Sequence, residues 1–234
     1  MLDQVNKERM MSQQMVDTNK TGVLAPEIKT CVEIEGLADI KETDTELVIY
    51  RRTLASGLND WIQELSPSVL PHLRIFAAPE DVPSALNPML DACGMPKNSM
   101  RKLLIRDITE LAFAFSQITE SKRVDLRLEH IKNDACWRFH IDYVEVRLLT
   151  TYLGATTEWV QPAYANQAIK QQRKFSGPLE HLDINDVAIF KGKSSSQTNG
   201  IVHRSPPLAG TGVSRLLLAL NKQSELSPAP WDNS

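Results

Sequence analysis

The sequence has few cysteines and no sign of a membrane or nucleic-acid protein. Its 234 residues include three cysteines, Cys31, Cys93 and Cys136, without Cys-x-x-Cys spacing, so we expect free thiols in a reducing cytoplasm. We expect Cys136 to be buried. No apolar run approaches the ~20 residues of a membrane helix, and Met1 to Lys20 lack an apolar signal core. The net charge of −3 argues against a nucleic-acid or membrane-surface partner.

Several sequence motifs of common enzymes are also missing. No Gly-x-Ser-x-Gly surrounds the serines at 194–196, which argues against a serine hydrolase, and Gly192 and Gly200 do not form a phosphate-binding loop. Hydrophobic residues make up 42% and charged residues 24%, as in ordinary globular proteins. The remaining signals come from periodicity and from a few histidines and carboxylates.

The apolar pattern divides the chain into three parts. Residues 1–44 have little periodicity and are expected to be a partly ordered arm, and residues 223–234 a C-terminal tail. The domain between them, 45–222, begins with a helical part (53–119), whose clearest helix follows a cap at Asn98 or Ser99. After Ser121 the period changes from 3.6 to 2, which predicts strands over 123–221.

This order of elements predicts an α+β fold whose strands close into a sandwich or barrel, with the N-terminal helices packed on a sheet. A doubly wound sheet is not expected, because strands and helices do not alternate after Ser121. The polar stretch 161–174 is interpreted as a lid or a surface loop.

The stretch from Trp137 to Asp142 alternates between apolar and polar residues. On a strand His140 and Asp142 point the same way, with Cα atoms roughly 6.6 Å apart. An imidazole and a carboxylate so placed, joined by a second imidazole, form the 2-His-1-carboxylate triad of non-haem iron oxygenases. We propose His203 as the second imidazole. Taken alone, each of these residues is more often a surface or structural residue.

Arg215 follows His203 by twelve residues, across a loop rich in proline and glycine. If this loop joins antiparallel strands, the two residues lie opposite each other and point to the same face. A cation beside a metal ligand requires an anion, and a dicarboxylate could chelate the metal at one end and pair with the guanidinium at the other.

These residues resemble a known superfamily. The order and spacing of His140, Asp142, His203 and Arg215 resemble those of the iron- and 2-oxoglutarate-dependent dioxygenases, which have a double-stranded β-helix (a jelly-roll or cupin-like barrel). The runs 148–153 and 157–159 are similar to the second barrel segment of its prolyl-hydroxylase-like branch, and 186–190 is similar to the segment before the distal histidine.

Residues 46–222 also resemble a bacterial family of domains of unknown function, the one numbered 1826. The similar stretches are Phe139 to Asp142, Val202 to Pro207 and Ser214 to Asn221. That family often occurs beside zinc-handling GTPases, which suggests a link to metal homeostasis.

The broader resemblance implies an Fe(II)/2-oxoglutarate-dependent oxygenase that hydroxylates a C–H bond of a small-molecule or protein substrate. It implies that His140, Asp142 and His203 hold iron, and that Arg215 binds the distal carboxylate of 2-oxoglutarate with Tyr152 as a hydrogen-bond partner. Two alternatives stay open. The same ligands could hold zinc in a non-catalytic metal-binding protein, or the barrel could be a scaffold without a metal. No residue pattern identifies the substrate or the oligomeric state.

Overall fold

A computed structural model describes residues 26–196 and 200–232, which form two β-sheets and several helices. The larger sheet has seven strands in the order β1-β2-β8-β5-β10-β4-β3, and the smaller has three in the order β7-β6-β9. All pairs are antiparallel except β1 with β2. The strands are β1 Glu27–Cys31, β2 Thr45–Tyr50, β3 His72–Ala77, β4 Val124–Ile131, β5 Val146–Leu153, β6 Glu158–Trp159, β7 Glu180–His181, β8 Val187–Lys191, β9 His203–Arg204 and β10 Arg215–Asn221.

After β4 the chain passes back and forth between the two sheets. It leaves the large sheet at β4, touches the small sheet at His140 through a single bridge to His203, and returns at β5. It then forms β6 and β7 in the small sheet, β8 in the large, β9 in the small and β10 in the large. This alternation brings segments that are distant in sequence to the space between the sheets.

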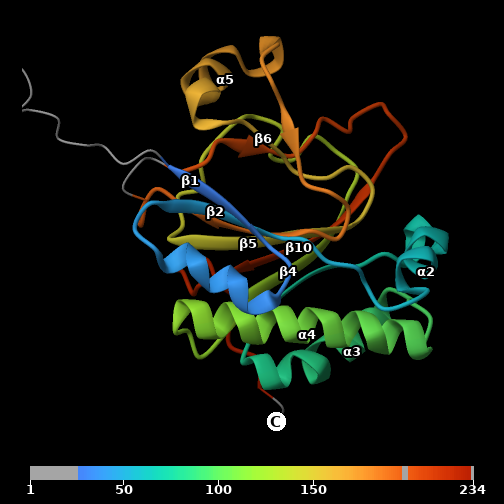
Figure 1. The fold of residues 1–234 in the computed structure, drawn as a ribbon. Helices are drawn as coiled ribbons and strands as arrows, with labels where there is room; N and C mark the ends of the chain where they lie inside the picture. Colours follow the sequence, from blue (N-terminus) through green and yellow to red (C-terminus); the bar gives the residue numbers. More distant parts are fainter. Residues whose placement is uncertain (1–25, 197–199, 233–234) are drawn as a thin grey trace, which may run out of the picture.

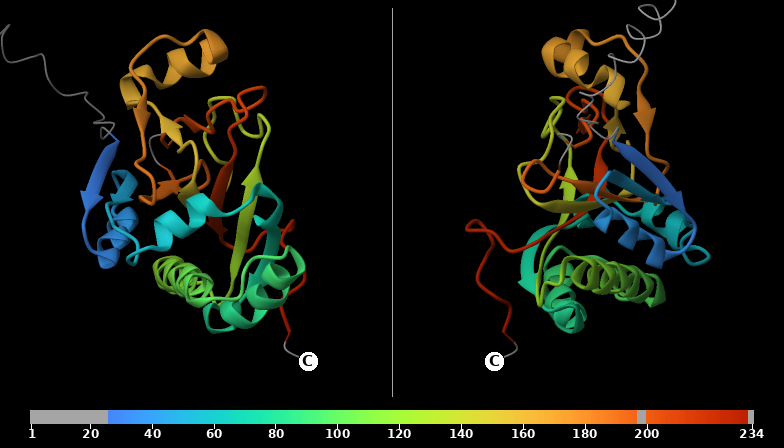
Figure 2. Two further views of the ribbon diagram at one scale, coloured as in Figure 1. Left: turned by 90° about the vertical axis from the view of Figure 1, so that its right-hand side faces the viewer. Right: turned by 60° about the vertical axis from the view of Figure 1, so that its left-hand side comes forward.

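The helices are arranged in layers around the sheets. Helices α3 and α4 lie along one face of the large sheet, and the small sheet and α5 lie on the other side (Figures 1 and 2). The α-helices are α2 Leu58–Glu64, α3 Val82–Ala92, α4 Ser99–Thr119 and α5 Ala165–Gln171, and the short 3-10 helices are Ile34–Lys41, Pro67–Val69, Pro79–Asp81, Pro162–Tyr164 and Gln172–Lys174. The α+β prediction, with helices packed on a sheet, is confirmed.

Helix α4 forms where the apolar spacing predicts it. The side chain of Asn98 caps it by accepting a hydrogen bond from Arg101 N at 3.0 Å, and the left-handed Glu120 (φ 52°) ends it. Its apolar stripe is fully buried against the large sheet at Leu104, Ile108, Leu111 and Phe115. Burial of such side chains stabilises the fold by roughly 1.5–3 kcal/mol each.

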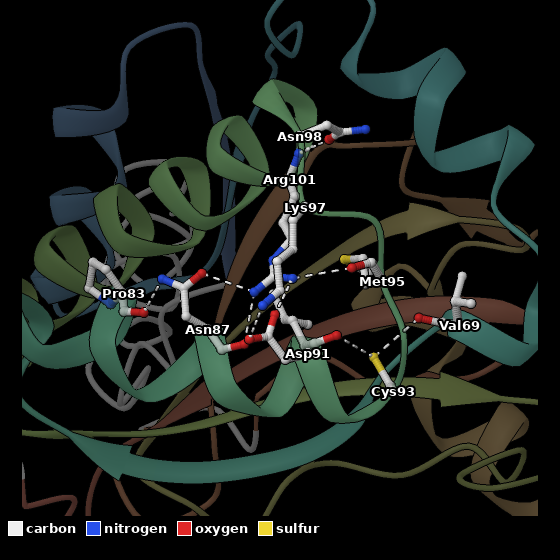
Figure 3. Close-up of polar contacts among 10 residues, drawn as sticks. Val69, Pro83, Asn87, Asp91, Cys93, Met95, Lys97, Asn98 and Arg101 are labelled. Atoms are coloured by element: carbon white, nitrogen blue, oxygen red, sulfur yellow. Dashed lines mark hydrogen bonds and ion pairs between the residues drawn. The ribbon is translucent and has the colours of Figure 1, made fainter.

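The junction between α3 and α4 is closed by a buried arginine (Figure 3). The guanidinium of Arg101 donates to Asp91 Oδ1 at 2.7 Å, to Met95 O at 3.1 Å and to the backbone and side-chain oxygens of Asn87 at 2.8 and 3.0 Å. Each hydrogen bond satisfies a polar group that packing would otherwise leave without water.

The ordered part of the chain extends beyond the predicted domain at both ends. Residues of the expected arm form β1, which pairs with β2, and a 3-10 helix whose Leu37 and Ile40 are buried. The expected tail returns to the large sheet, where Trp231 N donates to Phe76 O at 2.7 Å. Residues 1–25 lie outside the described part of the chain. Among the described helices, none combines the length and apolarity needed to cross a membrane.

Candidate metal centre

His140 and His203 come together because their backbones pair. Each donates its N–H to the carbonyl oxygen of the other at 3.0 Å, in the single bridge that joins the segment before β5 to β9. Directly paired residues project their side chains to the same face. The two rings therefore lie side by side, with centroids 4.7 Å apart.

The carboxylate of Asp142 lies between the two rings. Its Oδ1 is 3.6 Å from His140 Nε2, and its Oδ2 is 3.4 Å from His203 Nε2. The three potential ligand atoms all lie within 4.8 Å of one another. A single ion with bonds of about 2.0–2.2 Å places neighbouring ligand atoms about 3 Å apart, so one ion fits among these three with small adjustments.

Hydrogen bonds fix which nitrogen each ring presents. His140 Nδ1 donates to Arg138 O at 2.7 Å, and His203 Nδ1 donates to Ile201 O at 3.0 Å. A carbonyl oxygen can only accept, so each Nδ1 carries the proton of a neutral ring and each Nε2 keeps its lone pair. Outer hydrogen bonds of this kind are usual for metal-ligating histidines.

Asp142 is buried and only half satisfied. Its Oδ1 accepts from Arg147 Nη1 at 2.5 Å, whereas its buried Oδ2 has no hydrogen-bond partner. Burial raises the pKa of Asp142, but the adjacent imidazoles of His140 and His203 and the charge of Arg147 lower it further, so the pKa lies well below its usual value. An anionic oxygen without a partner, facing two imidazole lone pairs, fits a divalent cation.

The backbone around Asp142 is held by a close approach to the turn after β8. Lys193 N donates to Asp142 O at 2.8 Å, and Gly192 N donates to Glu145 O at 2.9 Å. A Cβ atom at Gly192 would lie 1.8 Å from Val144 O, so this approach requires glycine. Gly192 therefore helps to hold the carboxylate of Asp142 in position.

Arg215 is fully buried on β10 and has no carboxylate partner. It donates to Ser205 Oγ at 2.9 Å, Thr151 Oγ1 at 3.0 Å and Thr157 Oγ1 at 3.2 Å, and its buried Nε has no hydrogen-bond partner. Burial lowers the pKa of Arg215 to about 10. A buried guanidinium surrounded by neutral hydroxyls is a favourable place for an anion.

The same cavity reaches both features. A hollow of about 110 Å³ is lined by His140 and His203 and by Thr157 and Ser205, which are two of the hydrogen-bond partners of Arg215. This volume is about that of four waters in the liquid, enough for one small organic molecule. His140 and His203 thus line the cavity directly, whereas Asp142 and Arg215 lie behind residues that line it.

Tyr152 does not belong to this group. Its hydroxyl donates to Asp107 Oδ2 at 2.5 Å on the helix-covered face of the large sheet, and its ring packs in the core there. Burial raises the pKa of Tyr152 well above its usual value. The expectation that Tyr152 assists Arg215 is wrong, because neighbouring residues of a strand face opposite ways and Thr151 takes the inward position.

Two further expectations are wrong. Arg215 and His203 are not opposed on paired strands, because β9 pairs with β6 whereas β10 pairs with β4 and β5, and the loop between them crosses from one sheet to the other. Cys136 is exposed rather than buried, in a turn with a φ of 56°, and it lines the cavity.

Other residues of the site were not predicted from the sequence. Arg147, Thr151 and Ser205 contact the predicted residues, but their roles depend on how the strands pair. Gln172 comes from the stretch predicted as a lid or loop, which is instead largely helical. Its amide accepts from Phe139 N at 2.8 Å and donates to Phe139 O at 3.1 Å, which anchors the residue beside His140.

Comparisons with known proteins place the chain among related sequences. The sequence model of a family described as "Protein of unknown function (DUF1826)" matches residues 32–221. No curated protein matches the chain significantly.

Solved structures that resemble this chain include three proteins. A dioxygenase for auxin oxidation from rice is 12% identical (TM-score 0.46; 85% of this chain and 83% of that one). A prolyl-4-hydroxylase from Pseudomonas putida is 12% identical (TM-score 0.43; 87% and 100%). A full-length protein from Neurospora crassa, solved in complex with alpha-KG, is 11% identical (TM-score 0.46; 88% and 86%).

Proposed function

The chain belongs to the DUF1826 family, and we propose that it is an oxygenase that uses Fe(II) and 2-oxoglutarate to hydroxylate a C–H bond of a second substrate. The observation that carries this proposal is the pairing of two incomplete features around one cavity. Asp142 Oδ2 has no hydrogen-bond partner, and the buried Arg215 has no carboxylate. A cation and a dicarboxylate would complete both.

We also propose that the two sheets form a double-stranded β-helix, with 45–222 as the oxygenase unit and β1 added at its edge. The proposal is supported by the strand order, because β4, β5, β8 and β10 adjoin in one sheet while the segments between them adjoin in the other. In such a fold the site lies between the sheets, where His140 and Arg215 are found.

The donor set suits iron chemistry. Two imidazoles and one carboxylate bind one face of an octahedral ion and leave other positions for small molecules. When bound, Fe(II) with 2-oxoglutarate supplies the oxidising chemistry by which O₂ converts R–H to R–OH, with succinate and CO₂ as coproducts.

The protein side chains have positioning roles in this proposal. His140, Asp142 and His203 hold the ion, and Arg147 holds the carboxylate in place through its 2.5 Å hydrogen bond. Arg215 binds the distal carboxylate of 2-oxoglutarate, and its present partners Ser205 and Thr157 line the path to the metal.

The decisive experiment measures binding and turnover separately. Purified protein is titrated with Mn²⁺ and then with 2-oxoglutarate by calorimetry, and succinate release is measured with Fe²⁺ and O₂. We expect His140→Ala to lose metal binding, and Arg215→Ala to keep metal binding but lose 2-oxoglutarate binding. His181→Ala removes an exposed histidine of β7 and serves as the matched control.

Two results would contradict the proposal. If 2-oxoglutarate binds equally well to Arg215→Ala and to the wild type, the assignment of the co-substrate fails. If the protein purifies with stoichiometric zinc and shows no affinity for 2-oxoglutarate, the chain is a metal-binding protein without this activity.

A further inference from the structure

The wall of the cavity formed by β4 carries two charged side chains that the proposed mechanism does not use. Arg127 and Glu129 both line the cavity together with His140 and His203. They are two apart on one strand, so they point to the same face with Cα atoms roughly 6.8 Å apart. Their neighbours across the sheet on β10 are Ala219 and Leu217, which offer neither charge nor hydrogen bond.

The charged residues of this cavity fall into two groups. Arg147 pairs with Asp142 at 2.5 Å, and Arg204 pairs with Glu158 at 2.6 Å. Arg127 and Glu129 form no hydrogen bond and no ion pair with any residue in the described part of the chain, and the buried Nε of Arg127 has no hydrogen-bond partner.

The neighbours on β3 do not change this. Arg74 lies across from Arg127 but is bound by Asp125 through two hydrogen bonds, and His72 lies across from Glu129 and is exposed. Of the two carboxylates that flank Arg127 on its face of β4, Asp125 is already bound by Arg74, and Glu129 forms no ion pair with Arg127. Unpaired charges that line a cavity favour a ligand that brings the opposite charges.

From this arrangement we propose that the substrate is a zwitterionic free amino acid, with its α-carboxylate on Arg127 and its α-ammonium on Glu129. This assignment rests on the proposed function, since it places the side chain of the amino acid toward His140 and His203 as the part to be hydroxylated. A guanidinium binds a carboxylate through two parallel hydrogen bonds, and a carboxylate accepts from an ammonium.

The cavity has room for one of the two ligands, so the second must bind at its rim. Its volume of about 110 Å³ holds one small molecule, which in the proposed function is 2-oxoglutarate between the metal and Arg215. Arg127 and Glu129 are partly exposed, so they lie at the rim of the cavity where a second molecule can enter. A free amino acid extends from this rim toward the metal.

The test uses the full-length protein loaded with Mn²⁺ and 2-oxoglutarate, which does not turn over. Standard L-amino acids are screened one at a time by saturation-transfer NMR, and those that bind are measured by calorimetry. We expect at least one to bind, and its affinity to fall about 10- to 100-fold in Arg127→Gln and in Glu129→Gln, since each removes a charge-assisted interaction. Arg127→Lys keeps the charge and is expected to recover part of the loss.

Matched controls separate this site from general effects of charge and folding. Arg123→Gln removes an exposed arginine just before β4 and is expected to leave binding unchanged. Melting temperature and Mn²⁺ affinity should be the same in all these variants. The N-acetyl and the amide derivatives of the amino acid should each bind at least 10-fold more weakly, because each lacks one of the two charges.

The outcomes distinguish this inference from the proposed function. If Mn²⁺ and 2-oxoglutarate bind but no amino acid does, or if binding survives both substitutions, the substrate assignment is overturned and the proposed function stands. If neither Mn²⁺ nor 2-oxoglutarate binds, the proposed function fails. Titration of the unloaded protein with amino acids then tests the zwitterion site separately. Amino-acid binding that is present in the wild type and lost in Arg127→Gln supports the zwitterion site. Absence of amino-acid binding to the wild type overturns it.

Discussion

The two arginines that are buried in the described part of the chain have opposite surroundings. Arg101, at the junction of α3 and α4, is 3% exposed and satisfied by the carboxylate of Asp91 and three further oxygens (Figure 3). Arg215, between the sheets, is 0% exposed and has only three hydroxyl partners. The junction thus supplies a counter-charge for its arginine, whereas the residues around Arg215 supply none. The proposed role of Arg215 therefore rests on its burial without a counter-charge and not on burial alone.

The largest effect on stability is expected at the helix junction. Arg101→Leu removes the partner of Asp91 and leaves several buried oxygens without a donor, so the free energy of unfolding should fall by about 3 kcal/mol. Urea denaturation measures this change. Lys97→Leu removes the exposed second partner of Asp91 and is the control, with an expected loss below about 1 kcal/mol. Equal losses in the two variants would mean that Arg101 is not the stabilising partner.

The opposite result is expected for the arginine in the cavity. Arg215→Met should leave the free energy of unfolding unchanged or raise it, because a buried charge without a counter-charge is replaced by an apolar side chain. Its affinity for 2-oxoglutarate should fall about 10- to 100-fold. Folded Arg101→Leu protein should bind 2-oxoglutarate normally. A large loss of stability in Arg215→Met would remove the contrast between the two arginines.

A smaller effect is expected at the outer support of the metal ligands. Gln172→Ala removes both hydrogen bonds to Phe139, so His140 should be less well positioned and Mn²⁺ affinity should fall about 10-fold. Electron paramagnetic resonance of free Mn²⁺ measures this change. Gln171→Ala, at the neighbouring exposed residue, should have no effect. Unchanged Mn²⁺ affinity in Gln172→Ala would show that the backbone bridge to His203 alone positions the ring.

The smallest effect is expected for the ion pair between Arg74 and Asp125, which lies beside the unpaired Arg127. Burial raises the pKa of Asp125, but hydrogen bonds from Arg74 and Ser227 lower it further, so the folded pKa lies below the usual value. This stabilisation is present above the unfolded pKa of about 3.9 and is lost as the pH falls through the folded value. Asp125→Asn should therefore destabilise the protein by about 1 kcal/mol at pH 7. The difference from wild type should shrink below about pH 4 in urea titrations, and a difference independent of pH would exclude this ionic origin.

The grouping of the candidate metal ligands could be predicted from the sequence because local periodicity determines the direction of two of them. His140 and Asp142 share a face, as alternation predicts, and Phe139 points the other way into an apolar cluster. His203 and Arg215 were predicted from the ligands that a metal and a dicarboxylate require and from their order along the chain. The helix α4 was equally readable, since its apolar stripe and its cap at Asn98 are local features.

The pairing of distant strands could not be predicted in the same way. Strand β5 is buried on both faces, so apolar alternation does not show that Thr151 faces Arg215 while Tyr152 faces α4. The loop after β9 has the turn residues of a hairpin, yet it connects two sheets. The structure of residues 27–41 depends on the parallel pairing of β1 with β2. A strand as short as β1 carries no local pattern that would predict this pairing.

The hydrogen bonds from both imidazoles to carbonyl oxygens two residues earlier have a consequence for metal exchange. Because the acceptors belong to the same short segments as the rings, the main chain orients each ligand before an ion arrives. In the proposed function the entropy of ordering the ligands is then lost on folding rather than on coordination, so binding or exchanging an ion requires only small adjustments of the three side chains. The identity of the metal in the proposed site would accordingly depend on the supply of ions around the protein as well as on the ligand set.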